Sequence, residues 1–262
     1  MNILFVGDVV SDAGRSMLSK HLPRLKKELN IDLCIVNGEN SACGNGMLPS
    51  SAEDIFKCGA DVITGGNHTF RRHEILNYLE QNECAIRPYN CLNPDAEGRG
   101  YVVYDMGKTQ VAVINLVGNA YIDGYTNAFY AIDELLAKLS CKNIIIDFHA
   151  EATAEKAALA HYLDGRVTAI IGTHTHVRTA DARIFPNGLG FITDAGMTGP
   201  SFSVLGVDPA RAIQKMKSTT PVRFVAAEGE CIMDCVFIKI DEKNGKTTEI
   251  KAFEINEVAN NR

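Results

Sequence analysis

The chain has 262 residues, a length that suits one domain, and 46% of them are hydrophobic, enough for a sizeable core. Its 26 basic side chains are outnumbered by 32 acidic ones, and the net charge of −6 argues against a general nucleic-acid or anionic-membrane surface. No apolar run approaches the ~18 residues of a membrane span, and the apolar start is too short for a signal peptide. We expect a soluble, cytoplasmic protein with a single domain over residues 1–262, no stable nucleic-acid complex and no membrane association.

The first part of the chain alternates apolar runs with amphipathic stretches, which favours a largely parallel sheet with helices. Leucines repeat at helical spacing from Leu18 to Leu29, and Pro23 is expected to kink this helix or to mark its restart. Ser50 and Glu53 suit a capping box for a short helix. Strands are predicted at 3–6, 33–36, 61–64, 144–148 and 169–172, and further helices at about 72–80, 133–139 and 150–163.

The later part of the chain carries turn signals that favour antiparallel additions. Asn187-Gly188 predicts the turn of a hairpin over 183–193, and Asn244-Gly245 joins two further expected strands. Asp208 and Pro209 match an N-cap and the first position of a helix. Strands are also predicted at 101–104, 111–116, 222–227, 232–240 and 248–255, and a glycine-rich loop at 194–203.

The segment Gly65-Gly66-Asn67-His68-Thr69 follows one of the apolar runs. Its two glycines let the backbone turn sharply. Neighbouring side chains on extended backbone point to opposite sides, so one of Asn67 and His68 can face a metal while the other faces a substrate. Taken alone, the segment also fits a plain loop with a surface histidine.

The same pattern, a strand that ends in a metal-ligand type of side chain, recurs along the chain. The residues concerned are Asp8, Glu39, Asn40, Asn67, His68, His149, His174 and His176. The carboxyl ends of strands in an open α/β sheet share one edge, so these side chains are predicted to converge there. The spacing of His174 and His176 places both imidazoles on one face of extended backbone. Separately, Asp8 could cap a helix and His149 could be a hydrogen-bonded core histidine.

The donor types in this set are imidazole, carboxylate and amide oxygen, without thiolate, and they suit iron, manganese or zinc. Only Asp8 and Glu39 carry charge. Two divalent ions would outweigh these two carboxylates and leave a positive pocket that attracts phosphate despite the net charge of −6. A shared carboxylate is needed to hold two ions ~3.5–4 Å apart, and Glu39 is the candidate.

These blocks resemble the signature of the calcineurin-like metallophosphoesterases. The blocks are Asp8, 38–40, 65–68, His149 and 172–176. Two departures are clear: Asp8 is followed by Val9 and Val10 instead of the usual Asp-x-His, and Glu39 replaces the usual bridging aspartate. With both departures, with Asn40, and with the segments 148–153 and 193–200, the sequence resembles the YmdB-like branch of 2′,3′-cyclic nucleotide phosphodiesterases.

The resemblance implies a four-layer α-β-β-α sandwich with two divalent metal ions, iron or manganese first and zinc as the alternative. It implies that one ion is held by Asp8, Glu39, Asn40 and His176. The other would be held by Glu39, Asn67, His149 and His174. His68 would be the general acid that protonates the leaving oxygen.

The implied substrate is a 2′,3′-cyclic nucleotide, hydrolysed to a 3′-nucleotide. The alternatives are 3′,5′-cyclic nucleotides, nucleoside monophosphates and phosphoproteins, and, from another class, a regulatory protein with a non-catalytic metal site. A homo-oligomer is expected by analogy alone.

Overall fold

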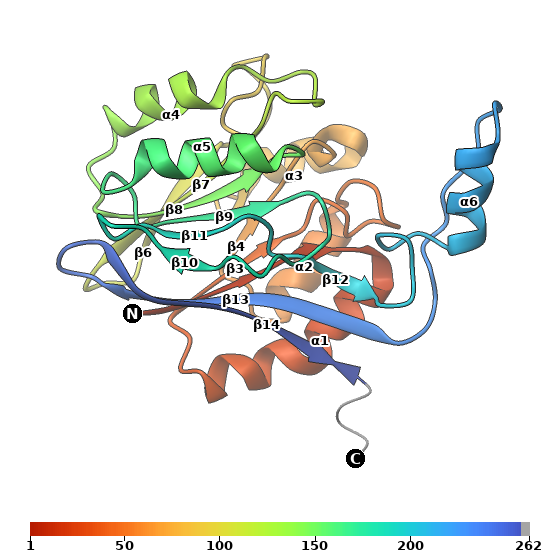
Figure 1. Cartoon of the computed structure of the whole chain (residues 1–262), viewed down its shortest axis with the longest axis horizontal. Helices are drawn as coiled ribbons and strands as arrows, with labels where there is room; N and C mark the ends of the chain where they lie inside the picture. Colours follow the sequence, from red (N-terminus) through yellow and green to blue (C-terminus); the bar gives the residue numbers. More distant parts are fainter. Residues whose placement is uncertain (258–262) are drawn as a thin grey trace.

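Two β-sheets face each other in the computed structural model, which describes residues 1–257 (Figure 1). The first sheet contains β1 (Asn2–Val6), β2 (Asp8–Val9), β3 (Leu33–Asn37), β4 (Val62–Thr64), β5 (Ala85–Ile86), β12 (Met197–Pro200), β13 (Cys231–Asp241) and β14 (Lys246–Asn256). Its order is β2-β12-β13-β1-β3-β4-β5, with β14 paired to β13. Strands β1, β3, β4 and β5 run parallel, so their carboxyl ends meet at one edge.

The second sheet contains β6 (Tyr101–Asp105), β7 (Gln110–Val117), β8 (Asn143–His149), β9 (Ala169–Thr173), β10 (Arg183–Ile184) and β11 (Gly190–Ile192). Its order is β10-β11-β9-β8-β7-β6. The four middle strands are parallel, and β6 and β10 add antiparallel edges. The carboxyl ends of β8 and β9 therefore also share an edge.

Helices cover the outer face of each sheet. On the first sheet lie α1 (Ser11–Glu28), α2 (Pro49–Lys57) and α3 (Leu76–Gln81), and on the second lie α4 (Ala128–Leu136) and α5 (Thr153–Leu163). Two 3₁₀ turns, Thr69–Arg71 and His73–Ile75, precede α3. The remaining helix, α6 (Pro209–Lys217), lies on an arm that projects from the body (Figure 1).

Strand alternation explains the layers, because successive side chains point to opposite faces of a sheet. In β1, Leu4 and Val6 join the core beneath α1, whereas Ile3 and Phe5 join the core between the two sheets. The predicted α-β-β-α sandwich is confirmed. Within residues 1–257 no helix combines the length and the apolar character that crossing a membrane requires.

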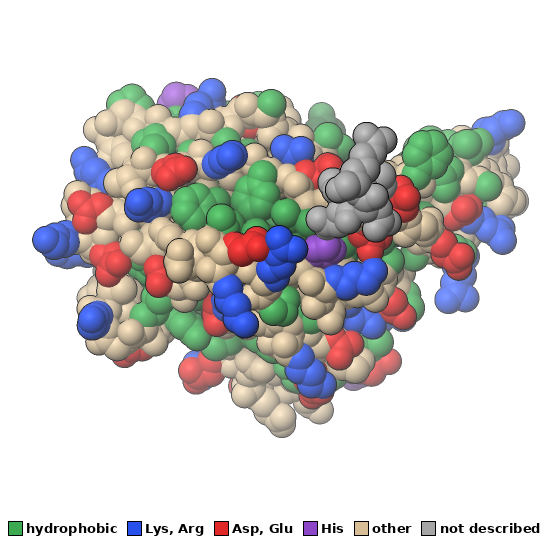
Figure 2. All heavy atoms as spheres, turned by 90° about the horizontal axis from the view of Figure 1, so that it is seen from below, with side chains coloured by type: hydrophobic (Ala, Val, Ile, Leu, Met, Phe, Trp, Pro, Cys, Tyr) green, Lys and Arg blue, Asp and Glu red, His purple; other side chains and the backbone are tan. Residues whose placement is uncertain are grey.

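The surface carries both acidic and basic side chains, as the composition of the chain leads one to expect. On the face shown in Figure 2, basic and acidic side chains are interspersed over the body of the molecule. Exposed large apolar side chains include Ile213 and Met216 on α6, and Phe202 and Phe224 in the segments before and after it.

Most predicted turns and caps are confirmed. The carboxylate of Asp208 accepts a hydrogen bond from the backbone N–H of Arg211 at 2.9 Å, with Pro209 at the first helical position. Gly188 and Gly245 adopt φ of 102° and 71°, as the predicted hairpin turns require. Pro23 lies inside α1 and does not end it.

Other predicted elements are wrong or shifted. The capping box at Ser50 and Glu53 is absent; the helix begins at Pro49, and the Ser51 hydroxyl accepts the Leu48 N–H at 2.9 Å. The segment 222–227 forms no strand but only an isolated bridge from Ala226. The expected loop at 194–203 contains β12, because its backbone fills the place between β2 and β13.

Candidate metal centre

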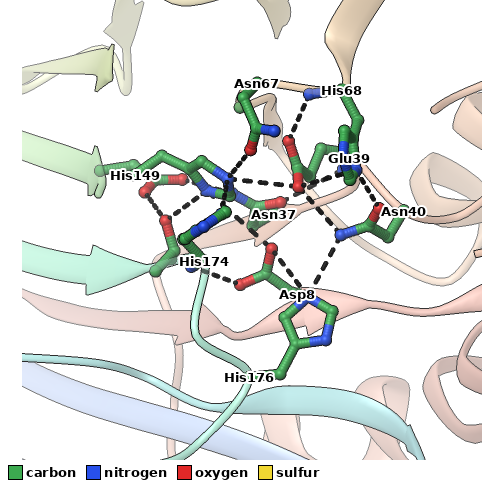
Figure 3. A network of polar contacts seen from close by, with 12 residues as sticks. Asp8, Asn37, Glu39, Asn40, Asn67, His68, His149, His174 and His176 are labelled. Carbon is green, nitrogen blue, oxygen red and sulfur yellow. Dashed lines mark hydrogen bonds and ion pairs between the residues drawn. The ribbon is translucent and has the colours of Figure 1, made fainter. Parts of the chain in front are cut away.

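The predicted site residues lie where the carboxyl ends of both sheets meet (Figure 3). The eight-stranded sheet contributes Asp8, Glu39, Asn40, Asn67 and His68, from β2 and from the turns after β3 and β4. The six-stranded sheet contributes His149, His174 and His176, from the end of β8 and the turn after β9. All eight side chains belong to one network of polar contacts.

The ring nitrogen Nε2 of His149 is the centre of a first group. It lies 2.9 Å from Asn67 Oδ1, 3.2 Å from Glu39 Oε1 and 3.0 Å from His174 Nδ1. His149 and Glu39 are almost completely buried. Four electron-pair donors of the kinds that iron, manganese and zinc bind therefore surround one small volume.

The outer nitrogen of His149 is engaged by a chain of hydrogen bonds. The Thr173 hydroxyl donates to Asp147 Oδ1 at 2.6 Å, so its oxygen accepts from His149 Nδ1 at 2.9 Å. A proton on Nδ1 leaves the lone pair of Nε2 directed into the site. This is the pattern of a metal-binding histidine, in which an outer partner fixes the tautomer. Asp147 therefore supports this histidine from outside the site.

In the other two histidines, too, the outer ring nitrogen has a partner that accepts a hydrogen bond. His174 Nε2 lies 3.0 Å from Glu151 Oε2, and His176 Nδ1 lies 3.0 Å from the carbonyl oxygen of Leu205. Both partners are acceptors, so both outer nitrogens are donors. The inner nitrogens, His174 Nδ1 and His176 Nε2, then present lone pairs to the site.

The close approach of His149 and His174 requires positive charge. Two nitrogen lone pairs 3.0 Å apart repel each other unless a proton or a cation lies between them. Burial disfavours a charged His149, yet Glu39 and Asp8 outweigh burial and raise its pKa to about 9. Burial and the neighbouring His149 lower the pKa of His174 to about 3. The donors thus fit a cation, which would take the place of the single proton that the pair holds.

A second group forms around Asp8. Its Oδ2 accepts the backbone N–H of His174 at 3.2 Å, whereas its buried Oδ1 has no hydrogen-bond partner within residues 1–257. His176 Nε2 lies 3.7 Å from this oxygen. Burial raises the pKa of Asp8. The helix after it begins without a side-chain cap at Val10, so Asp8 does not serve as a helix cap.

Glu39 joins the two groups. Its Oε1 lies 3.2 Å from His149 Nε2 and accepts from Asn40 Nδ2 at 2.9 Å. Its Oε2 accepts the backbone N–H of His68 at 3.0 Å. The Glu39 carboxylate therefore lies between the two sets of donors.

Asn40 differs from the expected arrangement. Its amide nitrogen, not its oxygen, faces Glu39 and His176, at 2.9 Å and 3.2 Å. Its oxygen lies 2.8 Å from His68 Nδ1. A half-turn of the carboxamide would direct the oxygen inward and the nitrogen to His68.

The glycines before Asn67 allow the strand end to approach the site. A Cβ on Gly66 would lie 2.2 Å from Glu39 Oε2 and 2.6 Å from His149 Nε2. Only glycine fits between these two side chains.

The sequence reasoning missed three residues that bind Asp147, namely Asn37, Thr64 and Thr173. Asp147 also accepts from Asn37 Nδ2 at 2.9 Å and Thr64 Oγ1 at 2.5 Å, so it ties β3 and β4 to β8 across the two sheets. Asn37, Thr64 and Thr173 are each the last residue of a buried strand, and that position was the available signal.

A buried ion pair holds the turn that carries two of the histidines. His174 and His176 have φ of 98° and 62°, a region that costs a non-glycine residue energy. Between them, Thr175 donates its N–H and hydroxyl to Asp194 Oδ2 at 3.1 Å and 2.8 Å. Lys156, fully buried, donates to the same oxygen and to the Thr173 carbonyl, both at 2.8 Å.

Comparisons with known proteins show the family of this chain. The profile of the YmdB-like protein family matches residues 4–253. The chain belongs to the YmdB-like family. It is 42% identical over 259 residues, 98% of each chain, to a protein of Bacillus subtilis described as a 2′,3′-cyclic-nucleotide 2′-phosphodiesterase.

Two solved structures show which fold this YmdB-like protein has. A structure described as a novel phosphatase from Mycoplasma pneumoniae superposes with a TM-score of 0.92 at 35% identity, covering 98% of this chain and 93% of its own. The calcineurin-like phosphoesterase YfkN of Bacillus subtilis superposes with a TM-score of 0.59 at 14% identity, covering 99% and 91%. The chain thus has the calcineurin-like phosphoesterase fold.

Replacing Gly66 tests the crowding at the site. Gly66→Ala should weaken Mn²⁺ binding about 10- to 100-fold, because the methyl group displaces Glu39 or His149. Isothermal titration measures the affinity. Gly107→Asn, in a surface turn where the new side chain has open space, is the control and should bind as the wild type does. Equal affinity for Gly66→Ala would show that this contact is not critical.

Removing the buried lysine tests the support of the histidine turn. Lys156→Met leaves the Asp194 charge buried without its partner and should lower the free energy of unfolding by about 3–5 kcal/mol. The double variant Lys156→Met/Asp194→Asn should lose less, since no charge is stranded. Urea unfolding provides both values. A double variant as unstable as the single one would contradict the assigned ion pair.

Proposed function

We propose that this chain is a phosphodiesterase with two divalent metal ions that hydrolyses 2′,3′-cyclic nucleotides to 3′-nucleotides. Iron or manganese are the expected metals, and zinc is the alternative. The 42% identical relative described as a 2′,3′-cyclic-nucleotide 2′-phosphodiesterase supports the substrate. Asp8, Glu39, Asn40 and His176 would hold one ion, and Glu39, Asn67, His149 and His174 the other.

One observation carries the proposal. Three histidines direct their inner nitrogens into the site, and hydrogen bonds or ion pairs hold their outer nitrogens. The same site contains a buried carboxylate oxygen of Asp8 that has no hydrogen-bond partner in residues 1–257. Burying these groups without a partner costs free energy, and a bound cation would remove that cost.

The metal ligands and His68 would have different roles in hydrolysis. When bound, the metal ions would offset the phosphate charge and acidify a water molecule to supply the nucleophile. Water oxygen bonds to phosphorus, and the bond from phosphorus to the 2′-oxygen breaks. His68 donates a proton to that leaving oxygen as general acid. Its side chain is 30% exposed, which leaves it open to a substrate.

Asn40 links metal binding to the acid. In the orientation of the structure, the Asn40 oxygen accepts from His68 Nδ1. This contact suits the protonated imidazole that a general acid needs, since a neutral ring would be left as an imidazolate after donating. Asn40 would thus position the acid in this orientation and bind the ion when its carboxamide turns.

Substitutions separate the two roles. Glu39→Ala and Asn67→Ala should lose metal and activity together, because both remove ligands. His68→Ala should keep its metal and lose about 10²–10⁴-fold in kcat, the usual contribution of a general acid. Metal content and turnover of 2′,3′-cyclic AMP measure the two effects. Equal metal loss in all three variants would contradict the role of His68.

The same assay addresses the other substrates. With Mn²⁺ added, turnover of bis(p-nitrophenyl) phosphate tests for any phosphodiesterase activity. A metal-loaded protein with no turnover would favour a regulatory role. Faster turnover of 3′,5′-cyclic AMP, a nucleoside monophosphate or a phosphopeptide would overturn the proposed substrate.

Metal affinity should depend on pH through His149. The pKa of His149 is about 9, and the metal needs the neutral ring, so binding at lower pH releases a proton. The apparent Mn²⁺ affinity should therefore rise about tenfold per pH unit from pH 6.5 to 8.5 and level off above about 9. Titration against a competing chelator measures it. An affinity that does not vary over this range would contradict a protonated His149.

A further inference from the structure

A pocket of about 420 Å³ opens beside the candidate metal centre. Asn67, a proposed metal ligand, is one of its lining residues. The neighbouring residue along the chain is His68, the proposed acid. This volume lies within the range of small-molecule sites, about 300–1,000 Å³.

Two loops form the walls of the pocket, and hydrogen bonds tie them to each other and to the site. Leu92 N–H donates to the Gly124 carbonyl at 3.0 Å, and Cys91 pairs with Tyr125 in a β-bridge. The Tyr125 hydroxyl lies 3.4 Å from the carbonyl oxygen of Gly66. The walls are therefore attached to the turn that carries Asn67.

The inner surface is suited to a flat ring. Phe70, Leu76, Leu92 and Tyr125 line it with apolar and aromatic groups, and Leu92 is 66% exposed. Aromatic side chains stack on any nucleobase, which has a π-face whatever its identity.

The rim of the pocket carries acceptors for hydrogen bonds. Glu97 and Asp123 line it, and within residues 1–257 neither carboxylate has a hydrogen-bond or ion-pair partner. A carboxylate here would not bind the phosphate. It would accept from N–H groups of a ligand, and a heterocycle with an amino group supplies them.

We propose that this pocket binds the nucleobase of the substrate and prefers guanine. The inference rests on the proposed function. The base is bonded to C1′, next to the C2′ that bears the leaving oxygen, so a base must lie close to the acid His68. Guanine presents adjacent N1–H and N2–H donors that one carboxylate can accept together. Uracil presents its N–H between two carbonyl acceptors, which the carboxylates of Glu97 and Asp123 repel.

Three cyclic phosphates test the proposal with the metal-loaded, full-length protein: 2′,3′-cyclic GMP, 2′,3′-cyclic UMP and the base-free cyclic phosphate of 1,2-propanediol. The kcat/KM for cyclic GMP should exceed that for the base-free compound by about tenfold or more, since stacking supplies that much binding. Cyclic UMP should fall between them. Binding of 3′-GMP and of inorganic phosphate, measured by calorimetry, provides a readout independent of turnover.

Variants locate the effect in the pocket. Leu92→Ser should reduce kcat/KM for both nucleotides and leave the base-free substrate unchanged. Glu97→Gln/Asp123→Asn should bring cyclic GMP and cyclic UMP to within about twofold of each other, since the charge discrimination is lost. Ile184→Ala and Glu249→Gln, exposed positions on the strands β10 and β14, are the matched controls and should change nothing.

The outcomes separate this inference from the proposed function. Turnover of all three compounds with equal kcat/KM, and equal affinity for 3′-GMP and phosphate, would overturn the pocket and leave the phosphodiesterase. Equal losses on the base-free substrate in the pocket variants would also overturn it. Turnover of none of the three would overturn the proposed function, and the pocket assignment with it.

Discussion

The structure depends on the convergence of electron-pair donors from two sheets at one buried edge. Asn67 and Glu39 come from the first sheet, and His149 and His174 come from the second. The donor atoms of the other three residues nevertheless lie about 3 Å from His149 Nε2. Mutual repulsion of these atoms would open the site unless a positive charge occupied it. The outer network through Asp147, which joins strands of both sheets, holds the donors in place against that repulsion.

This constraint explains how an acidic protein can attract an anionic substrate. The net charge of −6 is spread over a surface where both signs are interspersed, as Figure 2 shows for one face. At the site only Asp8 and Glu39 supply negative charge to the proposed ligand set. Two divalent ions would therefore leave local positive charge, and local charge determines what binds in a buried pocket.

Residue type and strand-end position were sufficient to predict that these side chains converge at one edge, because parallel strands bring their carboxyl ends together. The α-β-β-α sandwich was predicted from the family resemblance more than from the periodicity of apolar residues. Strand β12 could not be predicted, since Met197–Pro200 is paired through backbone contacts with β2 and β13 and shows no apolar alternation. Lys156 lies on a helix whose sequence resembles a solvated surface, and only the fold reveals that its charge is buried against Asp194. The amide orientation of Asn40 likewise depends on neighbours distant in sequence.

Metal analysis of the full-length protein, purified without chelator, tests the central claim most directly. Elemental analysis by plasma mass spectrometry should find about two iron or manganese ions per chain, held by the two groups that share Glu39. An active enzyme with no bound transition metal, or metal content unchanged after Glu39 is replaced by alanine, would contradict the account.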